Sequence, residues 1–419
     1  MPSSAPLQLI ARGRQDVYLT GDPQMTFFKQ VYRRYTPFAI ESIPIEFDGN
    51  TDFGRRISCT IPRKADLLWQ MFIEIELPPL PQPDVSGSPN LWVNDIAHAL
   101  IEDISIEIGD KEIDKHTGRW LNIWGELTTP AEKRDGYNAM VGHVATYPAG
   151  APDPTKPLRL TLPLRFWFNE NIGEALPLIS LQAHPVRLIL HLRPFQELWW
   201  NQDAFCPPPV GPCPTLEPVA ITRFQLFGDY VFLDTDERRK FAAAKHEYLI
   251  NQLQIVPPQS VPAGAASANI PLFLNHACKE FIWVVQQERM AAAHEWFNYG
   301  NLNECDTTGT PDDLLASAII RLDGYDRFHR RNALYFRLTQ PYQYHTNIPD
   351  NYIYLYSFSL HPESEQPSGS LNASKINDIQ LSLAFNTTLL SEPRMVHVWA
   401  TNYNVLRIVG GLGGLAFIA

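Results

Sequence analysis

The two halves of this chain carry the same short patterns in the same order. Four pairs of segments match: Leu67-Leu68-Trp69 with Phe281-Ile282-Trp283, Ile106 and Ile108 with Ile320 and Leu322, Val186, Leu188 and Leu190 with Ile379, Leu381 and Leu383, and Asp229-Tyr230 with Asn402-Tyr403. The spacing within these pairs falls from 214 residues to 193 and then to 173. It falls only where the first half has extra loop sequence, around 128–160 and 207–218. Self-similarity at this length indicates two copies of one domain.

Strand patterns dominate both copies. Apolar residues alternate with polar ones at 73–77, 104–108 and 188–192, and the longest such run covers 352–360. Period-two patterning places one face of a strand in a core and leaves the other for solvent or a neighbour. Many such strands at short intervals predict an all-β sandwich or jelly roll rather than βαβ units. Loops are predicted where Pro, Gly, Asn and Asp gather, at 78–95, 138–157, 201–218, 257–267, 301–313 and 362–370.

The clearest helix signal covers 235–246 and lies between the two copies. Asp234 is a candidate N-cap, and Glu237 three residues later completes the spacing of a capping box. We therefore interpret 234–246 as a connecting helix. Weaker patterns predict helical turns at 120–127 and 130–137.

Charge and composition exclude several classes of function. The net charge of −11 argues against direct binding of nucleic acid, which needs a basic surface. Neither a long apolar signal segment at the N-terminus nor a membrane-spanning run is present in the sequence. We expect a soluble protein that is made in the cytosol.

Five cysteines, at positions 59, 206, 213, 278 and 305, are typical of free thiols in a reducing compartment. Their spacing does not match a zinc site. The sequence leaves open a disulfide between Cys206 and Cys213, although free thiols are the favoured interpretation.

The sequence offers no catalytic, cofactor or metal site. The acidic run that begins at Asp234 is better explained as a helix cap than as a metal site, because no partner ligands follow at EF-hand spacing. The run 410–414 is glycine-rich but lacks the Lys-Ser/Thr of a phosphate loop, so a tight turn is favoured. Asp323-Gly324 is predicted to form a hairpin turn. We expect a protein that is not an enzyme.

Longer motifs carry a specific resemblance. They are GRQDVYLTGDPQMTFFKQVYRRYTPFAIESI at 13–43, GEALPLISLQAHPVRLIL at 173–190, LDTDERRKFAAAKHEYLINQLQ at 233–254, PSGSLNASKINDIQLSL at 367–383 and NYNVLRIVGGLGGLAF at 402–417. In this order they resemble the major capsid proteins of nucleocytoplasmic large DNA viruses, over nearly the whole chain.

The resemblance implies two tandem eight-stranded antiparallel jelly rolls in one chain. We expect an N-terminal arm at 1–25, a first jelly roll at 26–233, the connecting helix, and a second jelly roll at 247–419. It also implies a homotrimer that forms a pseudo-hexagonal capsomer and tiles an icosahedral shell. The implied partners are neighbouring capsomers, minor capsid and penton proteins, and an internal membrane. The implied location is the virion capsid, assembled in the host cytoplasm.

The N-terminal segment is the candidate assembly site, because in the family it lies on the inner side of the capsomer. Residues 1–35 contain five basic and two acidic side chains, an excess of three positive charges. One interpretation is that basic side chains meet acidic minor capsid proteins or lipid headgroups, and the other is that they are solvated. The aromatic side chains are expected to pack beneath the first jelly roll. The candidate residues are Arg12, Arg14, Phe27, Phe28, Tyr32, Arg33 and Arg34.

Two alternatives to a major shell subunit stay open at this point. The same fold could serve as a scaffold or a minor capsid paralogue. A β-sandwich that binds carbohydrate could use Trp199-Trp200 as a stacking platform, although packing at a domain or subunit interface is favoured for these residues.

Overall fold

The computed structural model describes residues 5–83, 87–206, 215–302, 304, 311–389 and 391–418. The chain divides into two compact units, Met1–Pro37 and Phe38–Ala419. The first unit contains two short helices, α1 (Ala5–Ile10) and α2 (Arg14–Thr20). Among the described residues, no helix is both long and apolar enough to cross a bilayer.

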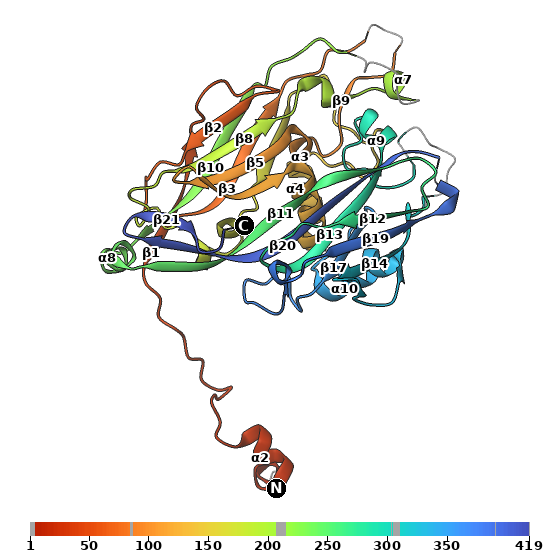
Figure 1. Cartoon of the computed structure of the whole chain (residues 1–419). Helices are drawn as coiled ribbons and strands as arrows, with labels where there is room; N and C mark the ends of the chain where they lie inside the picture. Colours follow the sequence, from red (N-terminus) through yellow and green to blue (C-terminus); the bar gives the residue numbers. More distant parts are fainter. Residues whose placement is uncertain are drawn as a thin grey trace. The chain divides into compact units, whose positions relative to one another are not determined.

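The unit Phe38–Ala419 contains two jelly rolls with the same strand order (Figure 1). In the first roll, one sheet has the order β1-β10-β3-β7 and the other β2-β8-β5-β6; in the second roll the orders are β11-β20-β13-β17 and β12-β19-β14-β15. The first roll comprises β1 (Phe38–Ile45), β2 (Arg56–Thr60), β3 (Leu67–Leu77), β5 (Ile101–Ile108), β6 (Lys111–Thr117), β7 (Leu158–Pro163), β8 (Val186–Leu192) and β10 (Arg223–Leu233). The second comprises β11 (His246–Val261), β12 (Ser267–Pro271), β13 (Ala277–Gln287), β14 (Leu315–Leu322), β15 (Tyr325–Asp326), β17 (Ile353–Ser357), β19 (Ile379–Phe385) and β20 (Arg394–Val409). The predicted duplication of an all-β domain is confirmed.

Each roll has its own apolar core between its two sheets. The inward residues of β3, β5, β8 and β10 supply much of the first core, and those of β13, β14, β19 and β20 much of the second. Burial alternates along β3 from Met71 to Leu77, as the period-two sequence pattern predicts. The strands β8 and β19 have identical burial patterns, with three consecutive buried residues in the middle of each. Burying apolar area at about 25 cal/mol per Å² is the main favourable contribution to such cores.

Two of the four repeated sequence patterns occupy equivalent positions in the two rolls, and two do not. Ile106 lies opposite Leu188 in the first roll, and Ile320 lies opposite Leu381 in the second, so these two pairs agree residue by residue. The other two pairs lie in corresponding strands but at shifted positions. Leu67 is opposite Val231, whereas Phe281 is opposite Ala400.

Several local predictions are confirmed, but some predicted loops contain regular structure: β4 (Leu91–Trp92) lies within 78–95 and α7 (Gln202–Phe205) within 201–218. The predicted helical turns are α4 (Gly118–Thr128) and α5 (Ala131–Val141). Asp323-Gly324 joins β14 to β15 with positive φ at both residues, as a tight hairpin requires. The loop predicted at 257–267 is partly strand, because β11 continues to Val261. Pro257 and Pro258 lie where the pairing of β11 with β20 is interrupted, which is where a strand tolerates residues without an N–H group.

Candidate assembly surfaces and the junction between the rolls

The junction between the rolls is built by α4, a helix of the first roll. Thr117 caps α4, because its hydroxyl accepts a hydrogen bond from the backbone N–H of Trp120. Four apolar side chains follow at the spacing of one helix face: Trp120, Ile123, Trp124 and Leu127. They pack on the outer face of the second roll, meaning the face of β11-β20-β13-β17 that is turned away from its own core, against Ile282, Val284, Ile353, Leu355 and Trp399. Burial on both sides explains why β13 is buried along nearly its whole length and apolar from Phe281 to Val285.

Aromatic contacts fix the position of α4. The Trp120 and Trp124 rings stack with centroids 5.2 Å apart, and Trp120 lies 6.4 Å from Trp399 of β20. The indole Nε1 of Trp124 donates to Glu170 Oε1 at 2.7 Å. Burial raises the pKa of Glu170, and the Trp124 hydrogen bond partly offsets this shift.

A buried charged network lies beside this helix. The His345 side chain, which is completely buried, contacts Glu280 Oε2 through Nε2 at 2.7 Å and Glu363 Oε1 through Nδ1 at 2.8 Å. Burial alone would lower the pKa of His345, but the two carboxylates outweigh it and raise that pKa to about 9. Burial would raise the pKa of Glu363, yet the hydrogen bond and charge of His345 leave it lowered. His345 is therefore held as an imidazolium between two carboxylates, a structural arrangement that locks three segments of the second roll together.

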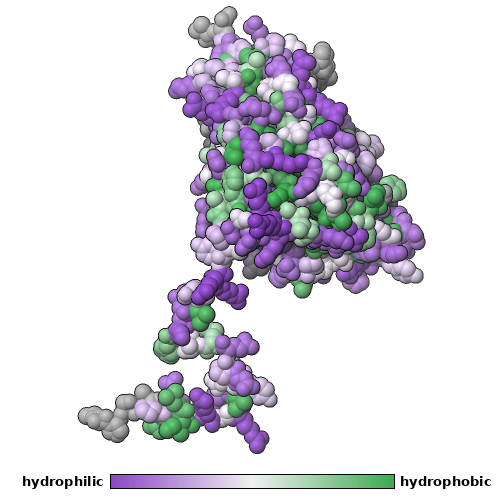
Figure 2. Space-filling model, turned by 90° about the vertical axis from the view of Figure 1, so that its left-hand side faces the viewer, coloured by the Kyte–Doolittle hydropathy of each residue, from purple (hydrophilic) through white to green (hydrophobic). Residues whose placement is uncertain are grey.

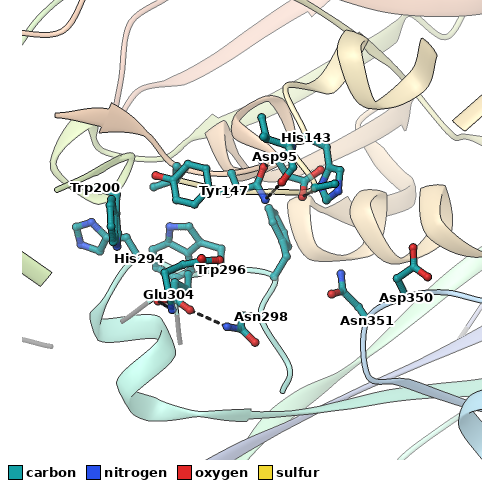
Figure 3. A pocket seen from close by; sticks show the side chains of 16 residues that line it. Asp95, His143, Tyr147, Trp200, His294, Trp296, Asn298, Glu304, Asp350 and Asn351 are labelled. Atoms are coloured by element: carbon teal, nitrogen blue, oxygen red, sulfur yellow. Dashed lines mark hydrogen bonds and ion pairs between the residues drawn. The ribbon is translucent and has the colours of Figure 1, made fainter. Parts of the chain in front are cut away.

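A pocket of about 330 Å³ opens between the rolls (Figure 3). His143 and Asp95 of the first roll form an ion pair on one side, with 2.8 Å between Nδ1 and Oδ2. On the other side Asn298 donates to Glu295 Oε2 at 2.7 Å. Burial raises the pKa of both Glu295 and Glu304 to about 7. Within the described residues, no group of His, Cys, Asp and Glu side chains is arranged to hold a metal ion.

Trp199 and Trp200 pack at the junction of the rolls, as favoured from the sequence. Both are buried, at 3% and 2% exposure, so they do not form an open platform for a sugar. The Trp199 carbonyl accepts from His294 Nδ1 at 2.9 Å, and Trp296 Nε1 donates to the Glu197 carbonyl. These bonds join the end of the first roll to a segment that follows β13 of the second.

The candidate residues of the N-terminal segment are all exposed. Arg12 follows α1, Arg14 begins α2, and the remaining candidates lie in the irregular segment after α2. Phe27 and Phe28 are 89% and 97% exposed. Apolar side chains intersperse with hydrophilic ones in this unit, and they also form patches on the face of the larger unit shown in Figure 2. Packing of the aromatic side chains beneath the first roll stays a prediction.

The connecting helix is α8 (Thr235–Ala243), shorter than predicted because His246 already begins β11. Asp234 occupies the N-cap position, but its side chain makes no capping hydrogen bond. The predicted capping box of Asp234 and Glu237 is therefore wrong. The buried carboxylate of Asp66 holds this segment instead: it accepts from the Leu233 backbone N–H at 2.9 Å and pairs with Arg238 at 2.8 Å.

Replacing Asp66 with alanine should loosen α8. The variant leaves the Leu233 N–H group without its acceptor, at a cost of about 1–3 kcal/mol in the free energy of unfolding. We expect faster trypsin cleavage at the basic residues of α8, measured in the folded protein. Asp236→Ala is the matched control, because Asp236 is exposed and its nearest cation is 3.9 Å away. Equal cleavage rates in the two variants would contradict this role of Asp66.

Two cysteines, Cys59 and Cys278, are free and buried. Burial raises the pKa of each thiol to about 12, which makes both poor nucleophiles. Cys206 is disulfide-bonded, so the free thiol favoured from the sequence is wrong at this position. Cys213 and Cys305 lie outside the described residues.

The network of His345, Glu280 and Glu363 could not be found from the sequence. These residues lie far apart along the chain, and each is an ordinary polar residue in its local pattern. The role of α4 did leave a signal, because Trp120 and Trp124 are four residues apart on a predicted helical turn. Two bulky apolar residues at that spacing indicate a buried helix face.

Comparisons with known proteins agree with this architecture. Residues 26–234 match a family model described as major capsid protein N-terminus, and residues 237–414 match one described as large eukaryotic DNA virus major capsid protein. The chain is 38% identical to the major capsid protein of Pyramimonas orientalis virus and 36% identical to that of Paramecium bursaria Chlorella virus 1, each over 98% of both sequences. The PBCV-1 virus capsid, a quasi-atomic model, is similar with a TM-score of 0.79 and 33% identity over 94% of this chain and 100% of that chain. The Faustovirus major capsid protein shares the fold, with a TM-score of 0.73 and 13% identity over 95% of this chain and 94% of that one.

Proposed function

The chain belongs to the major capsid proteins of large eukaryotic DNA viruses, and on that basis we propose that it acts as a homotrimer whose six jelly rolls form a pseudo-hexagonal capsomer. Membership of the family makes the chain a structural component of the virion capsid and not an enzyme. The proposed capsomers tile an icosahedral shell, with minor capsid and penton proteins as further partners. Synthesis and assembly take place in the host cytoplasm, over an internal membrane.

The observation that carries this proposal is the identical strand order of the two rolls. Each chain contributes two similar rolls, so an assembly of three chains has six similar outer sides. Contacts around the threefold axis close on themselves, whereas contacts between capsomers extend into a lattice. The division into arm 1–25, first roll 26–233, connecting segment 234–246 and second roll 247–419 is part of the proposal.

Negative-stain images of the purified protein test the trimer. We expect threefold particles with a hexagonal outline, and a matching trimer mass in sedimentation. A stable monomer would contradict the proposal.

The basic N-terminal segment is proposed to act in shell formation rather than in folding of the rolls. The described part of the unit that contains it has no side chain in a buried position, and the larger unit has its own cores. Deleting residues 1–25 should therefore leave soluble trimers that fail to form shells, as measured by sedimentation and electron microscopy of assembly reactions. The double variant Arg12→Gln, Arg14→Gln separates the role of charge from that of chain length. Normal shells from the deletion variant would contradict this role of the N-terminal segment.

A further inference from the structure

The second roll has a helical segment at the same place as α4, and three apolar side chains on it or just before it are exposed. The segment comprises a π-helical turn, η3 (Tyr335–Thr339), and α10 (Gln340–Tyr344). Leu334, Leu338 and Tyr342 are 45%, 39% and 77% exposed. Their spacing of four residues places them along one side of the segment. We call these three residues the helical stripe.

The sequence repeat identifies the counterpart of this stripe. Leu334 and Leu338 follow Trp120 and Trp124 by 214 residues, which is also the spacing between Ile106 of β5 and Ile320 of β14. In the first roll these positions hold α4 on the outer face of the second roll. The helical stripe therefore occupies the position of a docking surface.

A sheet face that matches it is open in the first roll. The outer face of the first roll is the face of β1-β10-β3-β7 turned away from its own core. One cross-strand row on this face runs through Pro44, Phe227, Phe72 and Pro163, which pair in succession across the four strands. None of the four is buried, and the two Phe rings stack with centroids 5.5 Å apart. A hollow of about 310 Å³, lined in part by Phe72, Pro163 and Met140, adjoins the row.

The second roll shows what such a row can bind. Its corresponding row runs through Ile255, Trp399, Ile282 and Leu355 across β11-β20-β13-β17. There, α4 of the same chain packs on Trp399, Ile282 and Leu355. The stripe and the open row cannot repeat this contact within one chain, because α10 and the sheet that contains β10 and β3 lie far apart (Figure 1).

We propose that the helical stripe of one copy packs on the open row of the next copy around the threefold axis. This inference rests on the proposed trimer and specifies its contact surface. The contact is head-to-tail, so three copies close it into a ring. The ring then alternates helix-on-sheet contacts within a chain and between chains.

Charges beside the two surfaces are complementary. The outward strand positions around the open row carry Glu46, Glu74, Glu76 and Asp229 against Arg159 and Arg223. Lys64 Nζ also donates to the Pro44 carbonyl at 3.1 Å, so one negative charge is left. The turn before the helical stripe carries three exposed arginines, at positions 327, 330 and 331. Complementary charges of this kind favour the correct register and partner.

Cross-linking tests the contact directly. A variant of the full chain with Pro163→Cys and Leu338→Cys is treated with a short bismaleimide, and the products are separated under denaturing conditions. We expect covalent dimers and trimers well above the background of the unsubstituted chain. The matched control carries Leu360→Cys, another exposed leucine, in place of Leu338→Cys, and it should stay at background. Equal yields from the two pairs would overturn the proposal.

A charge substitution tests the contribution of the stripe. Leu334→Glu with Leu338→Glu places carboxylates where an apolar surface is required, so we expect a monomer in sedimentation with an unchanged circular dichroism spectrum. Leu360→Glu should remain a trimer. If the unsubstituted chain is a trimer but the double variant is also a trimer, this contact is wrong and the proposed function stands. If the unsubstituted chain is a monomer, the proposed function itself fails.

Discussion

Replacing Trp120 with alanine should split the thermal unfolding of the protein into two transitions. Trp120 belongs to the first roll but is 3% exposed because it packs against Trp124 and against Trp399 of the second. Truncating a buried tryptophan costs about 3–5 kcal/mol in the free energy of unfolding. Since this cost falls on the junction, it should uncouple the rolls more than it weakens either core. Differential scanning calorimetry measures both effects.

The control for this prediction is a tryptophan inside one roll. Trp283 is fully buried in the core of the second roll, where its ring contacts Phe336 and Tyr354. Trp283→Ala should lower stability by a similar amount, but without selective loss of coupling between the rolls. If both variants give the same unfolding profile, α4 does not couple the rolls.

The His345→Leu variant should be strongly destabilised, by about 3–5 kcal/mol, because it removes the imidazolium that pairs with the buried carboxylate of Glu280. The effect should depend on pH. The pKa of His345 in the folded protein, about 9, lies above its ordinary value of 6.5. Protonated His345 therefore adds about 3 kcal/mol to the free energy of unfolding. This stabilisation is fully present below pH 6.5 and is lost as the pH rises through 9. Glu363 has the opposite pH dependence, because its pKa is lowered in the folded protein. The stability that its ionised form contributes is therefore lost as the pH falls below 4.5.

Denaturant unfolding at pH 6 and pH 9.5 measures this dependence. The difference between the original protein and His345→Leu should shrink at the higher pH. Adding Glu280→Gln to His345→Leu should restore part of the stability, since it removes the unpaired charge. His361→Ala, at an exposed histidine of the same roll, should change little at either pH. If the free energies of unfolding of the original protein and of His345→Leu differ by the same amount at both pH values, His345 is not an imidazolium in the folded state.

The fold was predictable because it is repeated and locally consistent. Segments such as 73–77 of β3 and 104–108 of β5 alternate apolar and polar residues, and this period alone indicates a half-buried sheet. Strand order was predictable only through the resemblance, because local patterns do not specify which strands pair. The failure at Asp234 has a similar origin: the spacing of a capping box was present, but Arg238 reached a carboxylate that lies far away in the sequence.

The candidate site was less predictable than the fold. The N-terminal residues were chosen from charge and family resemblance, and none of them has a buried partner that would reveal its role. The charged network beside the junction depends on Glu280, His345 and Glu363, which only the three-dimensional packing of the second roll brings together. The helical stripe was visible in the sequence only after the structure showed what Trp120 and Trp124 contact, because Leu334 and Leu338 look like ordinary core residues of a helix.

The covalent link between α4 and the sheet that it covers has a kinetic consequence. Within one chain the two surfaces meet at an effective concentration on the order of millimolar, whatever the amount of protein synthesised. In a hexagonal unit made from single-roll chains, every contact between neighbouring rolls would have to form by collision between separate molecules. In the proposed trimer, half of the contacts between rolls are already formed within each chain when folding ends, so nucleation would depend on a lower power of subunit concentration.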